Sequence, residues 1–417
     1  MISNFKNFIS EFLNRDGFHI LYATILARIL SFFASWIALQ LIPNFELGLV
    51  IYAINIISLI IPLSGLGASQ GLLRYGALLS TREEKNKLFV YVLKKGSVLS
   101  IFLIIITILL SGFLTGKLID SKPYLIAASI TIFTLFLLDS LKTQFRVLHQ
   151  NKLFASTEIL YNILLVMMVF FGSYFFKESG YIAALIIAPL LTFLIFLPKI
   201  KFNLKISNPL INPKLAFWKY SFYTGLSNVA TQLLIVLDII LIGTIIKNPE
   251  MVTIYKYLSL IPFSLLFLPR VILTTDFVTL TENFSERIYI NRYIKNYIFI
   301  FLVISFFILI ISIILNKQIL LIFGEEFVQY NTTFLVLIFG VTGILILRGL
   351  FGNLLSAMGK ASVNYWISII AIIVNLISNY ILIPKYGILG AAITSTIIMW
   401  LTSILSVVFF YYFQKKI

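Results

Sequence analysis

The sequence contains no cysteine and only two histidines among its 417 residues. Disulfides, thiolate metal sites and cysteine nucleophiles are therefore excluded, and His19 and His149 lie too far apart in the sequence to show a metal-ligand spacing. Charge is also scarce, because Asp, Glu, Lys and Arg make up 12% of the chain, whereas soluble domains carry about 25%. These absences exclude an ordinary globular enzyme, and we expect neither a metal site nor a cofactor.

The chain is predominantly apolar. They make up 60% of the chain, and the mean hydropathy is +1.02. Runs such as SIFLIIITILLSGFL, residues 100–114, are apolar on every face, whereas the strands of a membrane barrel alternate apolar and polar residues. The sequence therefore predicts an all-α polytopic membrane protein.

Twelve stretches are long enough to cross a hydrocarbon core of roughly 30 Å, which takes about 20 apolar residues. They run over residues 19–42, 47–72, 97–115, 123–141, 155–176, 181–198, 222–246, 251–275, 296–315, 328–350, 363–383 and 388–412.

The net charge of +16 indicates orientation rather than a nucleic-acid partner. Of the 32 Lys and Arg, 24 lie on the termini and alternate loops, 6 on the opposite loops and 2 inside spans. Cytoplasmic loops carry an excess of Lys and Arg. We therefore expect both termini to face the cytoplasm.

The polar segments between spans are too short for an extramembrane catalytic domain. The largest runs from Leu73 to Gly96. A membrane-embedded polymerase or acyltransferase would need acids, bases or nucleophiles gathered in a polar loop or cleft, but the outer loops contain no His and at most two acids each. The interpretation is a transporter rather than an enzyme.

An internal repeat divides the spans into two halves. GYIAALIIA from Gly180 resembles GILGAAITS from Gly387, and FRVLHQNK ending at Lys152 corresponds to LLSAMGK ending at Lys360, at offsets of 207 and 208. Related halves are common in transporters. The repeat predicts two six-helix lobes of the same topology and a basic cytoplasmic linker, with the bounds 1–198, 215–417 and 199–214 respectively.

Two stretches carry a resemblance to a known family. They are SAMGKASVNYWISIIAIIVNLISNYILIPKYGILGAAITST, residues 356–396, and PLSGLGASQGLLRYGA, residues 62–77. Both resemble the polysaccharide-transporter branch of the multidrug, oligosaccharidyl-lipid and polysaccharide exporter (MOP) superfamily, which contains the flippases for lipid-linked O-antigen, capsule and teichoic-type units. The resemblance covers most of the chain.

This resemblance implies two lobes around a central cavity that work by alternating access. It implies a substrate, an undecaprenyl-diphosphate-linked oligosaccharide, and a location in the bacterial cytoplasmic (inner) membrane. The expected partners are this lipid-linked substrate, membrane lipid, a coupling ion (proton or sodium) and a polysaccharide polymerase.

A multidrug exporter of the same superfamily, an ion-coupled antiporter, is the alternative. The resemblance implies that such an exporter would carry an acid in its first helix. Residues 19–42 contain Arg28 and no acid. The first span therefore suits an anion better than a cation.

Arg28 lies about 13 Å into the first span at 1.5 Å per residue, which is too deep for easy snorkelling. An ionisable residue at such depth is costly and is a functional hypothesis by default. A guanidinium binds phosphate in bidentate fashion, so one interpretation is a contact to the diphosphate of the substrate. The other is an ion pair that holds two helices together.

Three further residues are candidates for the cavity. Asp238, deep in the seventh span, either pairs with Arg28 or Lys256 or binds a coupling proton or cation. Gln232 lies opposite Arg28 at a repeat offset of 204, so the positive field of the cavity would be lopsided. Lys256 either contributes to the cavity or snorkels to the outer surface.

Arg74, Arg270 and Arg348 close the inner ends of the second, eighth and tenth spans. They serve either as positive-inside anchors or as guides for an anionic head group at the cytoplasmic mouth.

Two acids, Asp139 and Glu158, flank a basic loop near the cytoplasmic face. We expect each to pair with Lys142, Arg146 or Lys152.

Overall fold

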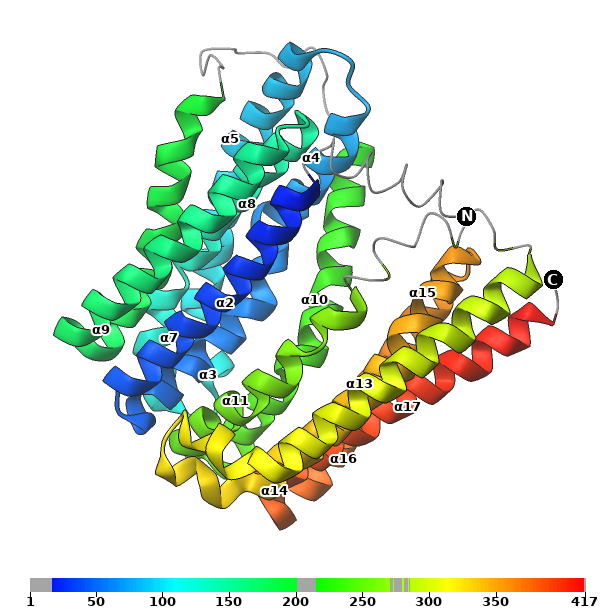
Figure 1. Cartoon of the computed structure of the whole chain (residues 1–417). Helices are drawn as coiled ribbons and strands as arrows, with labels where there is room; N and C mark the ends of the chain where they lie inside the picture. The colour runs from blue at the N-terminus through cyan, green and yellow to red at the C-terminus, as the bar shows by residue number, and fades with distance from the viewer. Residues whose placement is uncertain are drawn as a thin grey trace. The chain divides into compact units, whose positions relative to one another are not determined.

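The computed structural model describes residues 17–200, 215–270 and 286–415, together with positions 273, 280 and 284. These described residues form helices joined by short turns and contain no strand (Figure 1). Ten helical segments among them are long and apolar enough to cross a membrane. The predicted all-helical, polytopic membrane fold is confirmed, whereas most of the predicted linker, residues 201–214, lies outside the described residues.

The chain groups into two compact units, Met1–Gln232 and Leu233–Ile417. The boundary falls inside α10 (Leu215–Ile246), whose first half belongs to unit 1 and second half to unit 2. The division at the linker, with six helices in each lobe, stays a prediction.

Unit 1 contains the helices of the first six predicted spans. They are α2 (Gly17–Leu41), α3 (Asn44–Ile60), η1 (Ile61–Gly67), α4 (Ala68–Ala77), α5 (Arg82–Leu109), α6 (Ser111–Thr115), η2 (Ile119–Ser121), α7 (Lys122–Ala128), α8 (Thr131–Val147), α9 (Asn151–Phe196) and η3 (Leu197–Lys199). Its core is aromatic, with Phe89, Phe136 and Phe145 fully buried.

Unit 2 contains the remaining helices. They are the second half of α10, α11 (Pro249–Ser264), α13 (Arg287–Leu321), η4 (Glu325–Tyr330), α14 (Asn331–Gly343), the π-helix η5 (Ile344–Arg348), α15 (Gly349–Ala357), α16 (Ala361–Tyr386) and α17 (Ile388–Gln414). Helix α17 packs against both α14 and α16. The core gathers around Leu345, Phe351 and Phe410.

The second span is broken in its middle. Ser64 is extended, and Gly65, Leu66 and Gly67 have φ of 55°, 53° and 71° before α4 begins. Irregular backbone at membrane depth is tolerated only where protein buries it or water reaches it. Here it is buried, because a Cβ on Gly67 would collide with the carbonyl oxygen of Ser221 in α10.

Helix α9 is two spans joined by a single-residue turn. Lys177 has φ 51° and ψ −130° inside its 46 residues. The chain then doubles back, so that a Cβ on Gly180 would collide with the carbonyl oxygen of Gly172. The two arms therefore correspond to the fifth and sixth predicted spans.

The same turns show that the repeat has a different register from the predicted one. Lys177 shares its backbone conformation with Gly387 (φ 58°, ψ −137°), and His149 shares a positive φ with Gly359. Both pairs are 210 positions apart. The predicted offsets of 207 and 208 were therefore wrong by three and two residues, because apolar helix sequences match in several registers whereas a turn matches in one.

Candidate functional site

Asp238 is a carboxylate buried inside unit 2. Only 4% of the residue is exposed. Its Oδ1 accepts hydrogen bonds from Nδ2 of Asn375 at 2.9 Å and Nδ2 of Asn379 at 2.8 Å. Its Oδ2 accepts from the hydroxyl of Tyr255 at 2.9 Å and from the hydroxyl of Ser395. We call these five residues the Asp238 cluster.

Four helices contribute to the Asp238 cluster, and their packing brings together residues far apart in the chain. Asn375 and Asn379 lie 137 and 141 positions after Asp238, and Ser395 lies 157 positions after it. The two asparagines are four residues apart in α16, so they share one helix face, and Nδ2 of Asn379 also donates to Oδ1 of Asn375 at 2.9 Å.

All four donors in the Asp238 cluster are neutral, so nothing in it balances the charge of the carboxylate. Lys256 forms no ion pair with Asp238 among the described residues, which contradicts the predicted pairing with Lys256. The physical reason is that neutral donors already fill both oxygens. The four hydrogen bonds offset part of the cost of burying this charge, and no cationic side chain among the described residues pairs with it.

One buried hydrogen-bond acceptor of the cluster is unsatisfied. Oδ1 of Asn379 is buried and has no hydrogen-bond partner among the described residues. Carboxylate, amide and hydroxyl oxygens are the ligands that hard cations prefer. The Asp238 cluster therefore contains oxygens of the type that hard cations prefer, while its carboxylate oxygens accept four hydrogen bonds in this structure.

Arg28 and Gln232 lie in unit 1, on α2 and α10. Arg28 is exposed, and it forms no hydrogen bond or ion pair with another described residue. Nε2 of Gln232 donates to the hydroxyl of Ser58 at 3.2 Å. No described residue therefore neutralises Arg28, and its guanidinium is available to an anion.

The three arginines predicted for the cytoplasmic mouth have different surroundings. Arg74 is exposed and lies 4.5 Å from the ring centroid of Tyr220. Arg270 is exposed at the end of the segment Pro249–Arg270. Nη1 of Arg348 donates to Asn364 at 2.8 Å and to Ser406 at 2.5 Å.

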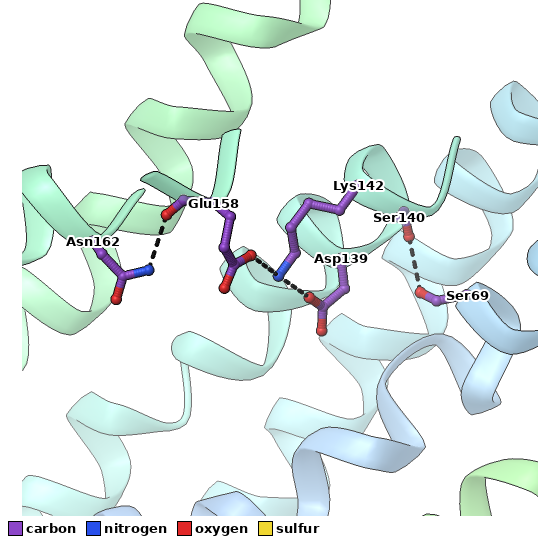
Figure 2. A network of polar contacts seen from close by, with 6 residues as sticks. All are labelled: Ser69, Asp139, Ser140, Lys142, Glu158 and Asn162. Atoms are coloured by element: carbon purple, nitrogen blue, oxygen red, sulfur yellow. Dashed lines mark hydrogen bonds and ion pairs between the residues drawn. The ribbon is translucent and has the colours of Figure 1, made fainter. Parts of the chain in front are cut away.

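The predicted pairing of Asp139 and Glu158 is confirmed, with Lys142 as the shared partner. Nζ of Lys142 lies 3.1 Å from Oδ1 of Asp139 and 3.1 Å from Oε2 of Glu158 (Figure 2). The ion triad joins α8 to α9. Arg146 instead lies 5.9 Å from the ring centroid of Phe154.

Tyr255, Asn375, Asn379 and Ser395 were not among the predicted site residues. A sequence signal exists for the two asparagines, since they are four residues apart in a largely apolar span. No local signal assigns them to Asp238, because the contact depends on how α16 packs against α10.

Sequence comparison gives a partial likeness. No protein-family model matches the chain. Over 135 residues it is 36% identical to the capsular polysaccharide biosynthesis protein CapF of Staphylococcus aureus, covering 32% of this chain and 33% of CapF. The chain thus matches about a third of the length of this curated relative.

Structural comparison extends over nearly the whole chain. The lipid II flippase MurJ in an inward-closed conformation has a TM-score of 0.74 at 19% identity, covering 95% of this chain and 87% of that chain. An inward-facing multidrug resistance MATE family transporter of the MOP superfamily has a TM-score of 0.67 at 16% identity, covering 92% and 94%. A variant of the Vibrio cholerae MATE transporter VcmN has a TM-score of 0.65 at 15% identity, covering 99% and 98%. These neighbours are transporters rather than enzymes, and the chain has the fold of the MOP superfamily.

Proposed function

We propose that the chain is a flippase that moves an undecaprenyl-diphosphate-linked oligosaccharide, of the O-antigen, capsule or teichoic type, across the bacterial cytoplasmic membrane by alternating access. Two likenesses support the substrate class: the partial identity to a capsular polysaccharide biosynthesis protein and the fold of a lipid II flippase. In this proposal both termini face the cytoplasm, and a polysaccharide polymerase takes up the delivered unit.

The Asp238 cluster is the single observation that carries the transport mechanism. A carboxylate that is 4% exposed and held by neutral donors is a costly feature in a membrane helix. Binding of a sodium ion or a proton removes that cost. A conformational equilibrium shifts only as far as a ligand differs in affinity for the two states, so a cation that binds one state more tightly drives alternating access.

Arg28 is the proposed contact for the diphosphate. It is exposed and without an ion pair among the described residues, and its guanidinium stays charged in a medium of low dielectric. Gln232, Lys256, Arg74 and Arg270 are candidates for further contacts along the path of the head group.

A multidrug exporter is the second candidate, because two of the three structural neighbours named above are MATE transporters. Such an exporter binds organic cations, which the exposed Arg28 of α2 would repel. The two candidates differ in the sign of the charge of the substrate, and this difference can be measured.

The test is transport in proteoliposomes that contain the full chain and a fluorescent lipid-linked oligosaccharide diphosphate. Under a sodium or proton gradient we expect outward flipping that Asp238→Asn abolishes, and Glu250→Gln serves as the control for loss of an acid. An exporter would instead accumulate ethidium under the same gradient and leave the lipid unflipped. That outcome would overturn the proposal.

A further inference from the structure

The two halves of the repeat each carry a cation at the hairpin between their fourth and fifth helices. In the first half, Lys142 of α8 binds Glu158 of α9, sixteen positions later. In the second half, Arg348 of η5 binds Asn364 of α16, also sixteen positions later.

Lys142 and Arg348 are not at equivalent positions of the repeat, although each contacts the residue sixteen positions later. At the structural offset of 210, Gly352 is the counterpart of Lys142. Arg348 precedes Gly352 by one helical turn, and its guanidinium lies over it, because a Cβ on Gly352 would be 3.4 Å from Nη1 of Arg348. The backbone of Gly352 thus lies beside the guanidinium, where a Cβ would make an ordinary van der Waals contact.

The groups that contact the two cations differ in charge. Lys142 lies between two carboxylates, so these three side chains together carry a net negative charge. Arg348 is held by the amide oxygen of Asn364 and the hydroxyl of Ser406, both neutral. Residues 327–417 contain no Asp or Glu, and no described carboxylate pairs with Arg348. Its positive charge is left without a counter-ion among the described residues.

The hydrogen bonds hold the guanidinium in one orientation. Asn364 is fixed by donating from Nδ2 to the carbonyl oxygen of Gly352 at 2.8 Å and to the hydroxyl of Ser356 at 3.1 Å. Ser406 donates to the carbonyl oxygen of Thr402 at 2.7 Å, which leaves its lone pairs to accept from Arg348.

Three of the five N–H donors of Arg348 have no acceptor among the described residues. A guanidinium has five N–H donors, and the two on Nη1 are used by Asn364 and Ser406. Nε and both donors of Nη2 form no hydrogen bond with a described residue. The Nε and Nη2 edge is the fork that binds two oxygens of one phosphate, and Arg348 is partly exposed.

We propose that Arg348 is a binding site for the phosphate group of a lipid, prepared by Asn364, Ser406 and Gly352. The lipid is either a resident anionic phospholipid or the diphosphate-linked lipid that the chain transports. Binding of the diphosphate-linked lipid rests on the proposed function and deepens it. The phosphate site itself is inferred only from the charge and geometry of unit 2. Basic pockets between membrane helices bind lipid head groups in this way.

The experiment compares lipid binding to the purified full chain by native mass spectrometry. The probes are phosphatidylglycerol, farnesyl diphosphate and, as the uncharged lipid, diacylglycerol. Asn364→Asp gives Arg348 an internal counter-ion in nearly the same shape, and Arg348→Gln removes the charge. We expect both variants to bind a phosphate probe at least about tenfold more weakly, a loss of about 1.4 kcal/mol, with diacylglycerol unchanged.

The control is Lys385→Gln, which removes an exposed cation at the other end of α16 and should leave binding unchanged. Loss confined to phosphatidylglycerol assigns the site to a resident phospholipid, and loss confined to farnesyl diphosphate assigns it to the transported lipid. If Arg348→Gln does not fold, Asn364→Asp still tests whether Arg348 binds a phosphate group. Unchanged binding of both phosphate probes in Asn364→Asp would overturn the proposal. None of these measurements requires transport, so a failed flipping assay does not affect them.

Discussion

Asn379 donates a hydrogen bond of 2.8 Å from Nδ2 to Oδ1 of Asp238, while its own Oδ1 is buried without a partner among the described residues. The amide supports the carboxylate and at the same time leaves one acceptor unsatisfied, which costs free energy in a buried place. A bound cation would use that acceptor. In the proposed mechanism the pair would therefore link the stability of unit 2 to the binding of the coupling ion.

The first prediction concerns this linkage. A ligand that binds only the folded state stabilises it by about 2.7 kcal/mol at a hundred times its Kd. The Tm of the wild-type chain in detergent should rise when sodium chloride replaces choline chloride, if sodium is the coupling ion. Asp238→Asn should lose this response, and Glu250→Gln should keep it. An unaltered response in Asp238→Asn would show that the ion acts elsewhere.

The second prediction concerns the ion triad of unit 1 (Figure 2). Lys142→Met leaves Asp139 and Glu158 without their shared cation. We expect a loss of about 1–3 kcal/mol, less than for a fully buried pair because the side chain of Asp139 is 49% exposed. Thermal unfolding measures it. The double variant Lys142→Met with Glu158→Gln should regain part of the loss, and a single variant as stable as the wild type would show that the triad contributes nothing.

The third prediction concerns the contact of α4 with the first half of α10. A Cβ on Gly71 would collide with Oγ of Ser221 and lie 2.8 Å from the ring of Phe217. Gly71→Ala should destabilise unit 1 by about 1–3 kcal/mol through overpacking, measured as a lower Tm.

Ser221→Ala should relieve part of this effect, since it removes Oγ, which has no hydrogen-bond partner among the described residues. Gly112→Ala is the matched control, because its Cβ would meet nothing closer than Nζ of Lys122 at 4.0 Å. Equal Tm values for Gly71→Ala and Gly112→Ala would count against close packing of these helices.

The fourth prediction concerns orientation. The chain has no native cysteine, so single cysteines report their own positions. Cysteines at Asn44, Asn248 and Lys385 should react with an impermeant thiol reagent in intact spheroplasts, whereas one at Ser80 should react only after lysis. The reverse pattern would place the termini outside the cytoplasm.

The fifth prediction concerns Arg28. Arg28→Lys keeps the charge but loses the planar fork, so flipping of the lipid-linked oligosaccharide should fall by about tenfold, and in Arg28→Ala by about a hundredfold or more. Adding Asp238→Ala to Arg28→Ala should not restore flipping. A double variant with near wild-type flipping would instead make Arg28 a structural partner of Asp238.

The fold class and the positions of the spans can be predicted from the sequence. Long apolar runs such as residues 100–114 can satisfy their backbone groups in a membrane only as helices, so hydropathy is sufficient to find them. The sequence also predicted a repeat, and it identified Asp238, Arg28 and the acids that bind Lys142 as candidates. These properties depend on composition and on residues close together in the chain.

The tertiary structure alone shows what Asp238 and Arg348 contact. Asn375 and Ser395 reach Asp238 across 137 and 157 positions, and Ser406 reaches Arg348 across 58. It also decided the register of the repeat, through the turn that Lys177 shares with Gly387. The physical reason is the same in each case: every face of a membrane helix is apolar enough for several packings, and the choice among them depends on a few buried polar contacts and glycines whose partners lie on other helices.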